Sequence, residues 1–186
     1  MARPWQLPNP EDLPAVAAFD RAIDGWIERY RNPRFDRAMY GLSSLADHSI
    51  LWFAIGGLRA LRRGDLRFAL KFGAAMSLES ALTNLVFKSA FRRVRPEHEI
   101  AQGPLPYGMR RPITSSFPSG HATAAFAAAT ILARTGRGNA SWFALAVLVA
   151  GSRVYVRMHH ASDVVVGAAI GLALGRAVLR WFPAEG

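Results

Sequence analysis

A stretch near the C-terminus, from about Asp163 to Phe182, is almost entirely apolar. A helix needs about 20 such residues to cross a bilayer, so this stretch is long enough to do so. Gly167, Gly171 and Gly175 recur in it at four-residue spacing. On a helix they share one face, and small residues in that arrangement let a second helix approach closely inside a membrane. We therefore expect a membrane-spanning helix that packs tightly against a neighbour.

Four further apolar stretches come before it: Ser43 to Leu61, Phe68 to Phe87, Gly120 to Ala133, and Ala140 to about Tyr155. The second of them is also long enough to span, and the other three are marginal. Lys71, Glu79 and Asn84 interrupt the second stretch. Polar groups at membrane depth face protein instead of lipid, and we interpret Glu79 as a structural hydrogen-bonding residue. The pattern predicts an all-α, membrane-embedded bundle with five apolar helices.

The N-terminal part of the chain differs from the rest. Residues 1–13 are rich in Pro and acidic side chains, and we expect an extended arm there. From Pro14 to about Tyr30 apolar residues recur every three or four positions, with charged residues such as Asp20 on the other face. This predicts one amphipathic helix, which carries too many charges to span a bilayer and should lie at the interface or against the bundle. A surface helix of a soluble domain has the same pattern. Arg31 to Arg37 should form a polar connector.

The composition excludes several kinds of chemistry. The chain has no Cys, so it has no disulfide, no thiolate metal site and no thiol nucleophile. Its formal net charge of +10 comes mostly from Arg. A basic protein suits an anionic membrane surface or a phosphorylated substrate. Nucleic acid is not an expected partner, because the Arg residues fall between apolar segments instead of along one helix face.

A long non-helical segment is expected from Lys88 to Phe117. It contains several Pro and Gly residues together with seven His, Lys or Arg side chains. Loops of this length inside a compact domain are usually functional or disordered. The charge of this loop favours an anion-binding role.

The segment from Ser152 to Asp163 places strongly polar residues between two apolar stretches. His159 and Asp163 are four apart, which would stack them on one face of a helix. A carboxylate bound to one imidazole nitrogen leaves the other nitrogen free to attack, and Arg153 could hold an anion beside it. In the alternative interpretation, Asp163 is the N-cap of the last helix, and His159 and His160 are interfacial polar residues.

Three polar clusters together carry a more specific signal. Lys88 and Arg95-Pro96 stand in KSAFRRVRP, PSGH opens the helix at Gly120, and the pattern SR-x5-H-x3-D ends at Asp163. This order resembles the tripartite signature of the type 2 phosphatidic acid phosphatase family. The family also includes bacterial acid phosphatases and vanadium haloperoxidases. Every signature position is matched, and each cluster lies at the end of an apolar helix.

Phosphoryl transfer explains why these residue types are needed. Cations and N–H donors must neutralise the equatorial oxygens of the phosphorus, and Lys88, Arg95 and Arg153 are the candidate cations. Ser119 and Gly120 stand at the start of a predicted helix, where free N–H groups and the helix dipole favour anions.

The resemblance implies the remaining roles. His159 is the implied nucleophile that forms a phosphohistidine, and Asp163 orients it. His121 is the implied acid that protonates the leaving oxygen and then activates water. We expect no metal and no cofactor, because the candidate ligands are interspersed with Arg and Lys, which would repel a cation. The other basic residues of these segments are expected to form a generally basic surface, with tuning of the pocket or binding of lipid headgroups as the alternative: Arg92, Arg93, Arg110, Arg111, Arg157 and His160.

These observations predict a metal-independent membrane phosphatase made of a single domain, 1–186. The arm and amphipathic helix would occupy 1–37, and a transmembrane catalytic core would occupy 43–182. Expected substrates are lipid-linked phosphate monoesters or diphosphates: phosphatidic acid, phosphatidylglycerol phosphate, a polyprenyl (di)phosphate or a polyprenyl-linked phosphosugar. A soluble acid phosphatase and a vanadium haloperoxidase are the alternatives within the family. A small membrane transporter or scaffold is the alternative outside it.

Five spanning helices would place the loop Lys88–Phe117, the segment Arg153–Asp163 and the N-terminus on one side of the membrane. The turns at Arg59–Arg67 and Arg134–Arg137 would lie on the other side with the C-terminus. Short loops rich in Lys and Arg stay in the cytoplasm. The active-site side is also rich in Arg, but several of its cations are assigned to phosphate binding and report less on topology. We therefore expect a plasma-membrane protein whose active site faces outward. No cleavable signal peptide is visible at the N-terminus, so internal helices would direct insertion.

Overall fold

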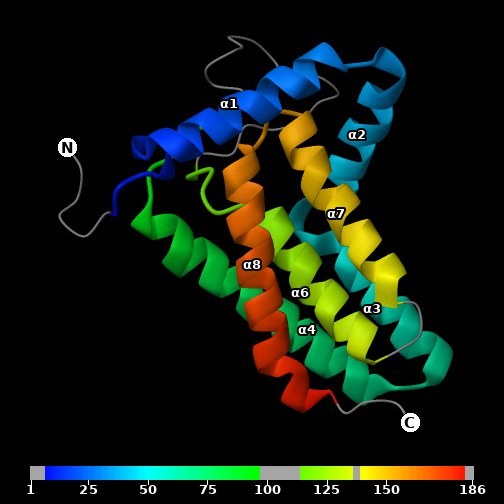
Figure 1. Ribbon diagram of the computed structural model, residues 1–186. Helices are drawn as coiled ribbons and strands as arrows, with labels where there is room; N and C mark the ends of the chain where they lie inside the picture. Colours follow the sequence, from blue (N-terminus) through cyan, green and yellow to red (C-terminus); the bar gives the residue numbers. More distant parts are fainter. Residues whose placement is uncertain (1–6, 97–113, 136–138, 183–186) are drawn as a thin grey trace.

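The computed structural model describes residues 7–96, 114–135 and 139–182, and these residues form helices and no strands (Figure 1). The helices are α1 (Pro14–Arg29), α2 (Pro33–Leu45), α3 (Ile50–Arg63), α4 (Leu66–Ala81), α6 (Gly120–Arg134), α7 (Asn139–Tyr155) and α8 (Ala161–Val178). α4 continues through the short helices η3 (Leu82–Phe87) and η4 (Lys88–Ala90). The five apolar helices predicted from the sequence correspond to α3, α4, α6, α7 and α8.

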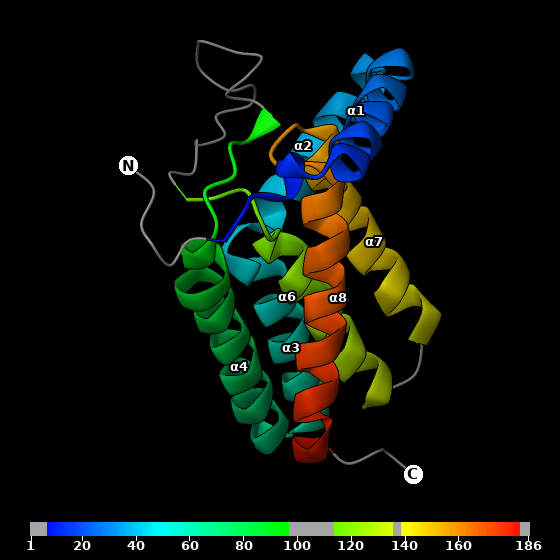
Figure 2. The ribbon, with the colours of Figure 1, turned by 60° about the vertical axis from the view of Figure 1, so that its left-hand side comes forward.

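Helix α6 is the centre of the bundle. It packs most extensively against α8 and α7, with α4 and α3 completing the surround (Figure 2). The glycine stripe of α8 lies against α6, as its spacing predicts. A Cβ added at Gly167 would lie 2.5 Å from the backbone oxygen of Ser119, and one at Gly175 would lie 2.7 Å from Thr130 Cβ. A larger residue at either position would push α8 off α6.

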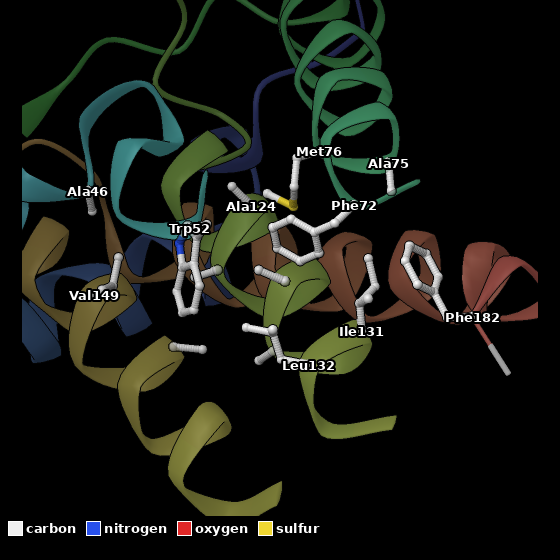
Figure 3. Packing of buried hydrophobic residues seen from close by; sticks show 14 of the residues in the cluster. Ala46, Trp52, Phe72, Ala75, Met76, Ala124, Ile131, Leu132, Val149 and Phe182 are labelled. Carbon is white, nitrogen blue, oxygen red and sulfur yellow. The ribbon is translucent and has the colours of Figure 1, made fainter. Parts of the chain in front are cut away.

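Small residues on α6 face large ones on α3 and α4. Ala124 of α6 is buried in the same cluster as Trp52 of α3 and Phe72 of α4 (Figure 3). Ala125 and Ala128 of α6 belong to this cluster too. Large aliphatic side chains lie on the outer surface of the bundle, where acyl chains can cover them: Leu58, Leu61, Leu70, Leu78, Leu85, Val147, Leu148 and Val165. Among the described residues, only Ala161–Trp181 is by itself both long and apolar enough to cross a bilayer.

The expected connector at Arg31–Arg37 is wrong, because α2 begins inside it. Pro33 is the first residue of α2, where its missing N–H costs nothing, and the Asn32 side chain accepts a hydrogen bond from Arg34 N at 2.9 Å. The apolar stretch expected from Ser43 is also divided. α2 ends at Leu45, a short turn (η2) covers Asp47–Ser49, and α3 begins at Ile50.

Helix α1 is amphipathic, as predicted, and begins at Pro14. It lies across the end of the bundle where α7 ends and α8 begins (Figure 1). Its buried face is different from the expected one, because Asp20 is buried with Ile27 while Trp26 is exposed. Ser162 of α8 and Arg93 explain the difference, because both donate hydrogen bonds to the buried Asp20 carboxylate. The α3–α4 turn lies at the opposite end of the bundle (Figure 1).

Candidate active site

The start of α6 forms one wall of the candidate site. Ser119 is the N-cap of α6: its Oγ accepts a hydrogen bond from Ala122 N, and its own N–H donates to the backbone oxygen of Asp163 at 3.0 Å. This ties the start of α6 to the start of α8. Lys88 lies beside it, since a Cβ on Gly120 would be 3.6 Å from Lys88 Nζ. The first turn of a helix and a cation therefore face the same space, an arrangement that suits an anion.

His159 lies in the connection between α7 and α8 and is 2% exposed. Its Nε2 is 3.2 Å from Arg95 NH1, and its Nδ1 is 3.5 Å from Asp163 Oδ2. A guanidinium has no acceptor, so Nε2 presents its lone pair and the ring proton is on Nδ1, toward the carboxylate. This is the tautomer that a nucleophilic Nε2 requires. The Nδ1 contact is longer than a good hydrogen bond, as is common before substrate binds.

The surroundings of His159 also keep it uncharged. Burial, together with the nearby charges of Arg95, Arg153 and Lys88, lowers the pKa of His159 well below its ordinary value. Because a protonated imidazole has no lone pair, this favours attack at neutral pH.

Asp163 faces the histidine as expected, but it is not the N-cap of α8, so the alternative interpretation is wrong in that detail. His160 is the N-cap of α8, and Asp163, in the first turn, accepts a hydrogen bond from His160 N at 2.9 Å. The same Oδ2 atom is the one near His159 Nδ1. The residue thus stabilises the start of α8 and faces the histidine at the same time. His159 itself precedes the helix, so the expected stacking along one helix does not apply.

His121, in the first turn of α6, meets a residue that the sequence analysis did not assign. Its Nε2 is 2.8 Å from Asp47 Oδ1, and Arg153 NH1 is 3.4 Å from the same oxygen. Arg153 also donates to the Oγ and the backbone oxygen of Ser43. Asp47 lies in the turn between α2 and α3, where it interrupts an apolar stretch. That interruption was the available signal, because a carboxylate in an apolar setting is usually functional.

Arg93 is the second residue that was missed. The expected basic surface is wrong for it, because it is 4% exposed and donates to Asp163 Oδ1 at 2.6 Å. Arg157 does not match that expectation either, since it forms ion pairs with Asp24 and Glu28 of α1 at 2.7 and 2.9 Å. Two adjacent Arg in KSAFRRVRP are indistinguishable by type, and only the fold separates buried Arg93 from exposed Arg92.

Other expectations have simpler outcomes. His160 Nε2 is 3.2 Å from the backbone oxygen of Val94. Glu79 accepts a hydrogen bond from Thr83 at 2.9 Å, consistent with a structural role. Arg110, Arg111 and the middle of the expected anion-binding loop lie outside the described residues. Within 7–96, 114–135 and 139–182, no group of three or more His, Cys, Asp or Glu is placed to hold a metal ion.

All eight residues proposed from the sequence therefore meet at one end of the bundle. They come from four separate parts of the chain: Lys88 and Arg95 after α4, Ser119, Gly120 and His121 at the start of α6, Arg153 at the end of α7, and His159 and Asp163 at the start of α8. Three cations, a neutral imidazole and a helix N-terminus around one space can bind a phosphate and attack it.

Comparisons with known proteins agree with this geometry. The sequence profile of the PAP2 superfamily matches residues 68–186. Decaprenylphosphoryl-5-phosphoribose phosphatase from Mycobacterium tuberculosis is 34% identical over 146 residues, which cover 74% of this chain and 75% of that protein. The protein of the same description from Mycolicibacterium smegmatis is 37% identical over 128 residues, covering 68% and 67%.

Two solved structures share the fold. A transmembrane PAP2 type phosphatidylglycerolphosphate phosphatase from Bacillus subtilis superposes with a TM-score of 0.72 and 26% identity, covering 92% of this chain and 88% of that one. LpxE from Aquifex aeolicus superposes with a TM-score of 0.68 and 27% identity, covering 86% and 93%. With its three motifs gathered at one end of a matching helical bundle, the chain belongs to the PAP2 superfamily.

Proposed function

We propose that this protein is a membrane phosphatase that removes a phosphate from a lipid-linked substrate through a phosphohistidine on His159. The observation that carries the proposal is the setting of His159, whose Nε2 faces Arg95 while its Nδ1 faces Asp163. The substrate phosphate would be bound by Lys88, Arg95, Arg153 and the N–H groups at the start of α6. Their positive charge neutralises the oxygens as the transition state forms.

The first chemical step transfers the phosphoryl group to the enzyme. His159 Nε2 forms the new bond to phosphorus while the bond to the leaving oxygen breaks. His121 gives its proton to that oxygen. Asp163 stabilises the positive charge that the ring of His159 acquires, through its Nδ1–H.

The second step releases inorganic phosphate. His121, now without its extra proton, takes one from water, and the water oxygen attacks phosphorus. The phosphorus–nitrogen bond breaks, and its electron pair returns to His159 Nε2. The enzyme is then restored, with no metal or external cofactor needed by any step.

The proposed substrate class is a lipid-linked phosphate monoester or diphosphate near the membrane surface. The mycobacterial relatives are described as acting on decaprenylphosphoryl-5-phosphoribose, and another relative, from Porphyromonas gingivalis, as a lipid A 1-phosphatase. That last protein matches over only 20% of its own length. On this basis a polyprenyl-linked phosphosugar is the first substrate to test, before phosphatidylglycerol phosphate, phosphatidic acid and polyprenyl diphosphate.

Phosphate release by the purified protein, measured across these four lipids in mixed micelles, tests the function. We expect release with at least one lipid, no loss of activity in EDTA, and inhibition by vanadate, which mimics the five-coordinate transition state. Loss of activity in EDTA that a divalent ion restores would contradict the mechanism. Absence of phosphate release from every lipid and from p-nitrophenyl phosphate would favour a transporter or scaffold.

The site would face the outside of the plasma membrane. The opposite end of the bundle carries Arg in short turns near helix ends: Arg59, Arg62, Arg63, Arg67, Arg134, Arg176 and Arg180. The site end also carries Arg, but several of these are assigned to the phosphate, so the Arg in short turns support a cytoplasmic location for the opposite end. Because the chain has no Cys, the single variants Arg34→Cys and Arg62→Cys report on the two ends. An impermeant thiol reagent on intact cells should label position 34 and spare position 62. The reverse pattern would place the site in the cytoplasm.

A further inference from the structure

Arg93 bridges two buried carboxylates. Its NH1 donates to Asp163 Oδ1 and its NH2 to Asp20 Oδ2, each at 2.6 Å. Asp20 belongs to α1, far from Asp163 in the sequence, and both carboxylates are at most 3% exposed. The bridge therefore connects the N-terminal helix to the residue that faces His159.

Asp20 also contacts the residue before Asp163. Its carboxylate accepts hydrogen bonds from Ser162 N at 2.8 Å and from Ser162 Oγ at 2.7 Å, and Arg93 NH1 also donates to Ser162 Oγ at 2.7 Å. Ser162 directly precedes Asp163. The position of the Asp163 carboxylate is thus set by Arg93 from one side and by the Asp20–Ser162 contacts through the backbone.

The charge of Arg93 would weaken the effect of Asp163 on His159 if Asp20 did not balance it. A guanidinium 2.6 Å from Asp163 would by itself cancel most of the charge that should stabilise His159. Asp20 balances that guanidinium, so Asp20, Arg93 and Asp163 together keep one net negative charge. Glu11 Oε2 is 2.9 Å from Arg93 Nε, but its side chain is 39% exposed, so solvent screens its contribution.

One net negative charge is what the reaction needs beside His159. The ring becomes cationic when Nε2 bears the phosphoryl group, while Arg95, Arg153 and Lys88 already surround it with positive charge. We infer that Asp20 and Arg93 are a positioning pair that keeps the Asp163 carboxylate aimed at His159 and available to its charge, which makes α1 part of the catalytic apparatus. This rests on the proposed function. The family match begins at residue 68, so it does not include α1.

Asp20→Asn tests the pair, because it keeps the shape of the side chain and removes its charge. With full-length protein in detergent and p-nitrophenyl phosphate as substrate, kcat should fall about tenfold to a hundredfold, the loss typical of removing an orienting partner. KM should change little, since the phosphate-binding cations are untouched. Asp24→Asn is the matched control: it breaks the ion pair from α1 to Arg157 but does not reach Asp163, and it should stay within about fivefold of the parent.

A double variant separates charge balance from simple docking of α1. In Asp20→Asn, Arg93 is left to neutralise Asp163. In Asp20→Asn with Arg93→Gln, Asp163 regains its charge, so the double variant should be several times faster than Asp20→Asn alone. Equal losses in Asp20→Asn and Asp24→Asn, or a double variant no faster than Asp20→Asn alone, would overturn the inference.

Folding is checked by the thermal midpoint in detergent. Should Asp20→Asn fail to fold, Arg93→Lys decides, because it keeps the charge and removes the two-carboxylate bridge. We expect a lower kcat with KM unchanged, while Arg92→Lys leaves both unaltered; an unchanged kcat in Arg93→Lys would overturn the pair. A parent protein that hydrolyses no phosphate ester refutes the proposed function, whereas an active parent with a fully active Asp20→Asn variant refutes only the pair.

Discussion

The two histidines of the site are held in different ways. The group around His159 is closed, since His159, Asp163, Arg93 and Asp20 are each at most 4% exposed. The group around His121 is open, with the side chain of His121 18% exposed and that of Asp47 42% exposed. A nucleophile must meet the phosphorus in one orientation, which a buried network enforces. A proton donor must reach both a leaving oxygen and a water molecule, which requires access from outside.

Carboxylates from the N-terminal part of the chain act on both histidines. Asp20 on α1 acts behind His159, through Arg93 and Asp163, and Asp47 in the turn after α2 contacts His121 directly. The part of the chain before α3 thus supplies two carboxylates to a site whose motifs all lie later in the chain. The closed side should tolerate substitution poorly, and the open side should tolerate it better.

The largest effect is expected on the closed side, at the nucleophile. His159→Ala should lower kcat about ten-thousandfold or more, because no other group is placed to accept the phosphoryl. His160→Ala, one residue later, is the control and should retain most of the activity. Phosphate release from p-nitrophenyl phosphate measures both, and substantial turnover in His159→Ala would exclude the phosphohistidine mechanism.

On the open side, His121→Ala should lower kcat for a lipid substrate about a thousandfold, within the range for a lost general acid–base group. The loss should be smaller for p-nitrophenyl phosphate, whose leaving group needs no proton. Because hydrolysis of the phosphohistidine also needs His121, the second step is slowed as well. An acid-labile phosphoenzyme should then accumulate. Rapid quenching with labelled substrate measures it. Equal losses with both leaving groups, and no phosphoenzyme, would argue against the role of His121.

Substituting the carboxylate that contacts each histidine compares the closed and the open side directly. Asp163→Asn should lower kcat about a hundredfold, because the buried Nδ1–H loses the charge it faces. Asp47→Asn should cost less than about tenfold, because solvent can replace an exposed partner. Steady-state kinetics on the two variants gives the ratio, and a larger loss in Asp47→Asn would reverse the comparison.

The smallest effect concerns the pH dependence that Lys88 gives the reaction. This cation lies beside the start of α6. Burial, with the neighbouring charges of Arg95 and Arg153, lowers the pKa of Lys88 to about 8. Lys88 is cationic below that pH and neutral above it, so kcat/KM should fall as the pH rises through about 8. Arg stays charged throughout, so Lys88→Arg should move this fall to higher pH even if it lowers the rate severalfold. If kcat/KM of Lys88→Arg falls at the same pH as that of the parent, the fall comes from the titration of another group.

Much of this molecule follows from local sequence. The five apolar helices and the glycine face of α8 are evident from residue type and spacing, because helix period and apolar length are local properties. The eight motif residues were identified because three local patterns resemble a family signature. The start of α2 was missed although Asn32-Pro33 is a helix-start signal, since its charged first turn looks like a loop.

Only the tertiary structure showed that further charged residues, Asp20, Asp47 and Arg93, reach the site. Asp20 lies on α1 among other charged residues, and Arg93 stands next to Arg92, with nothing in the sequence to distinguish them. Their importance comes from a meeting of α1, the segment after α4 and the start of α8, which are far apart along the chain. A residue's type is set locally, but whether its charge is buried and against which partner depends on how the helices pack, and that decides its chemistry.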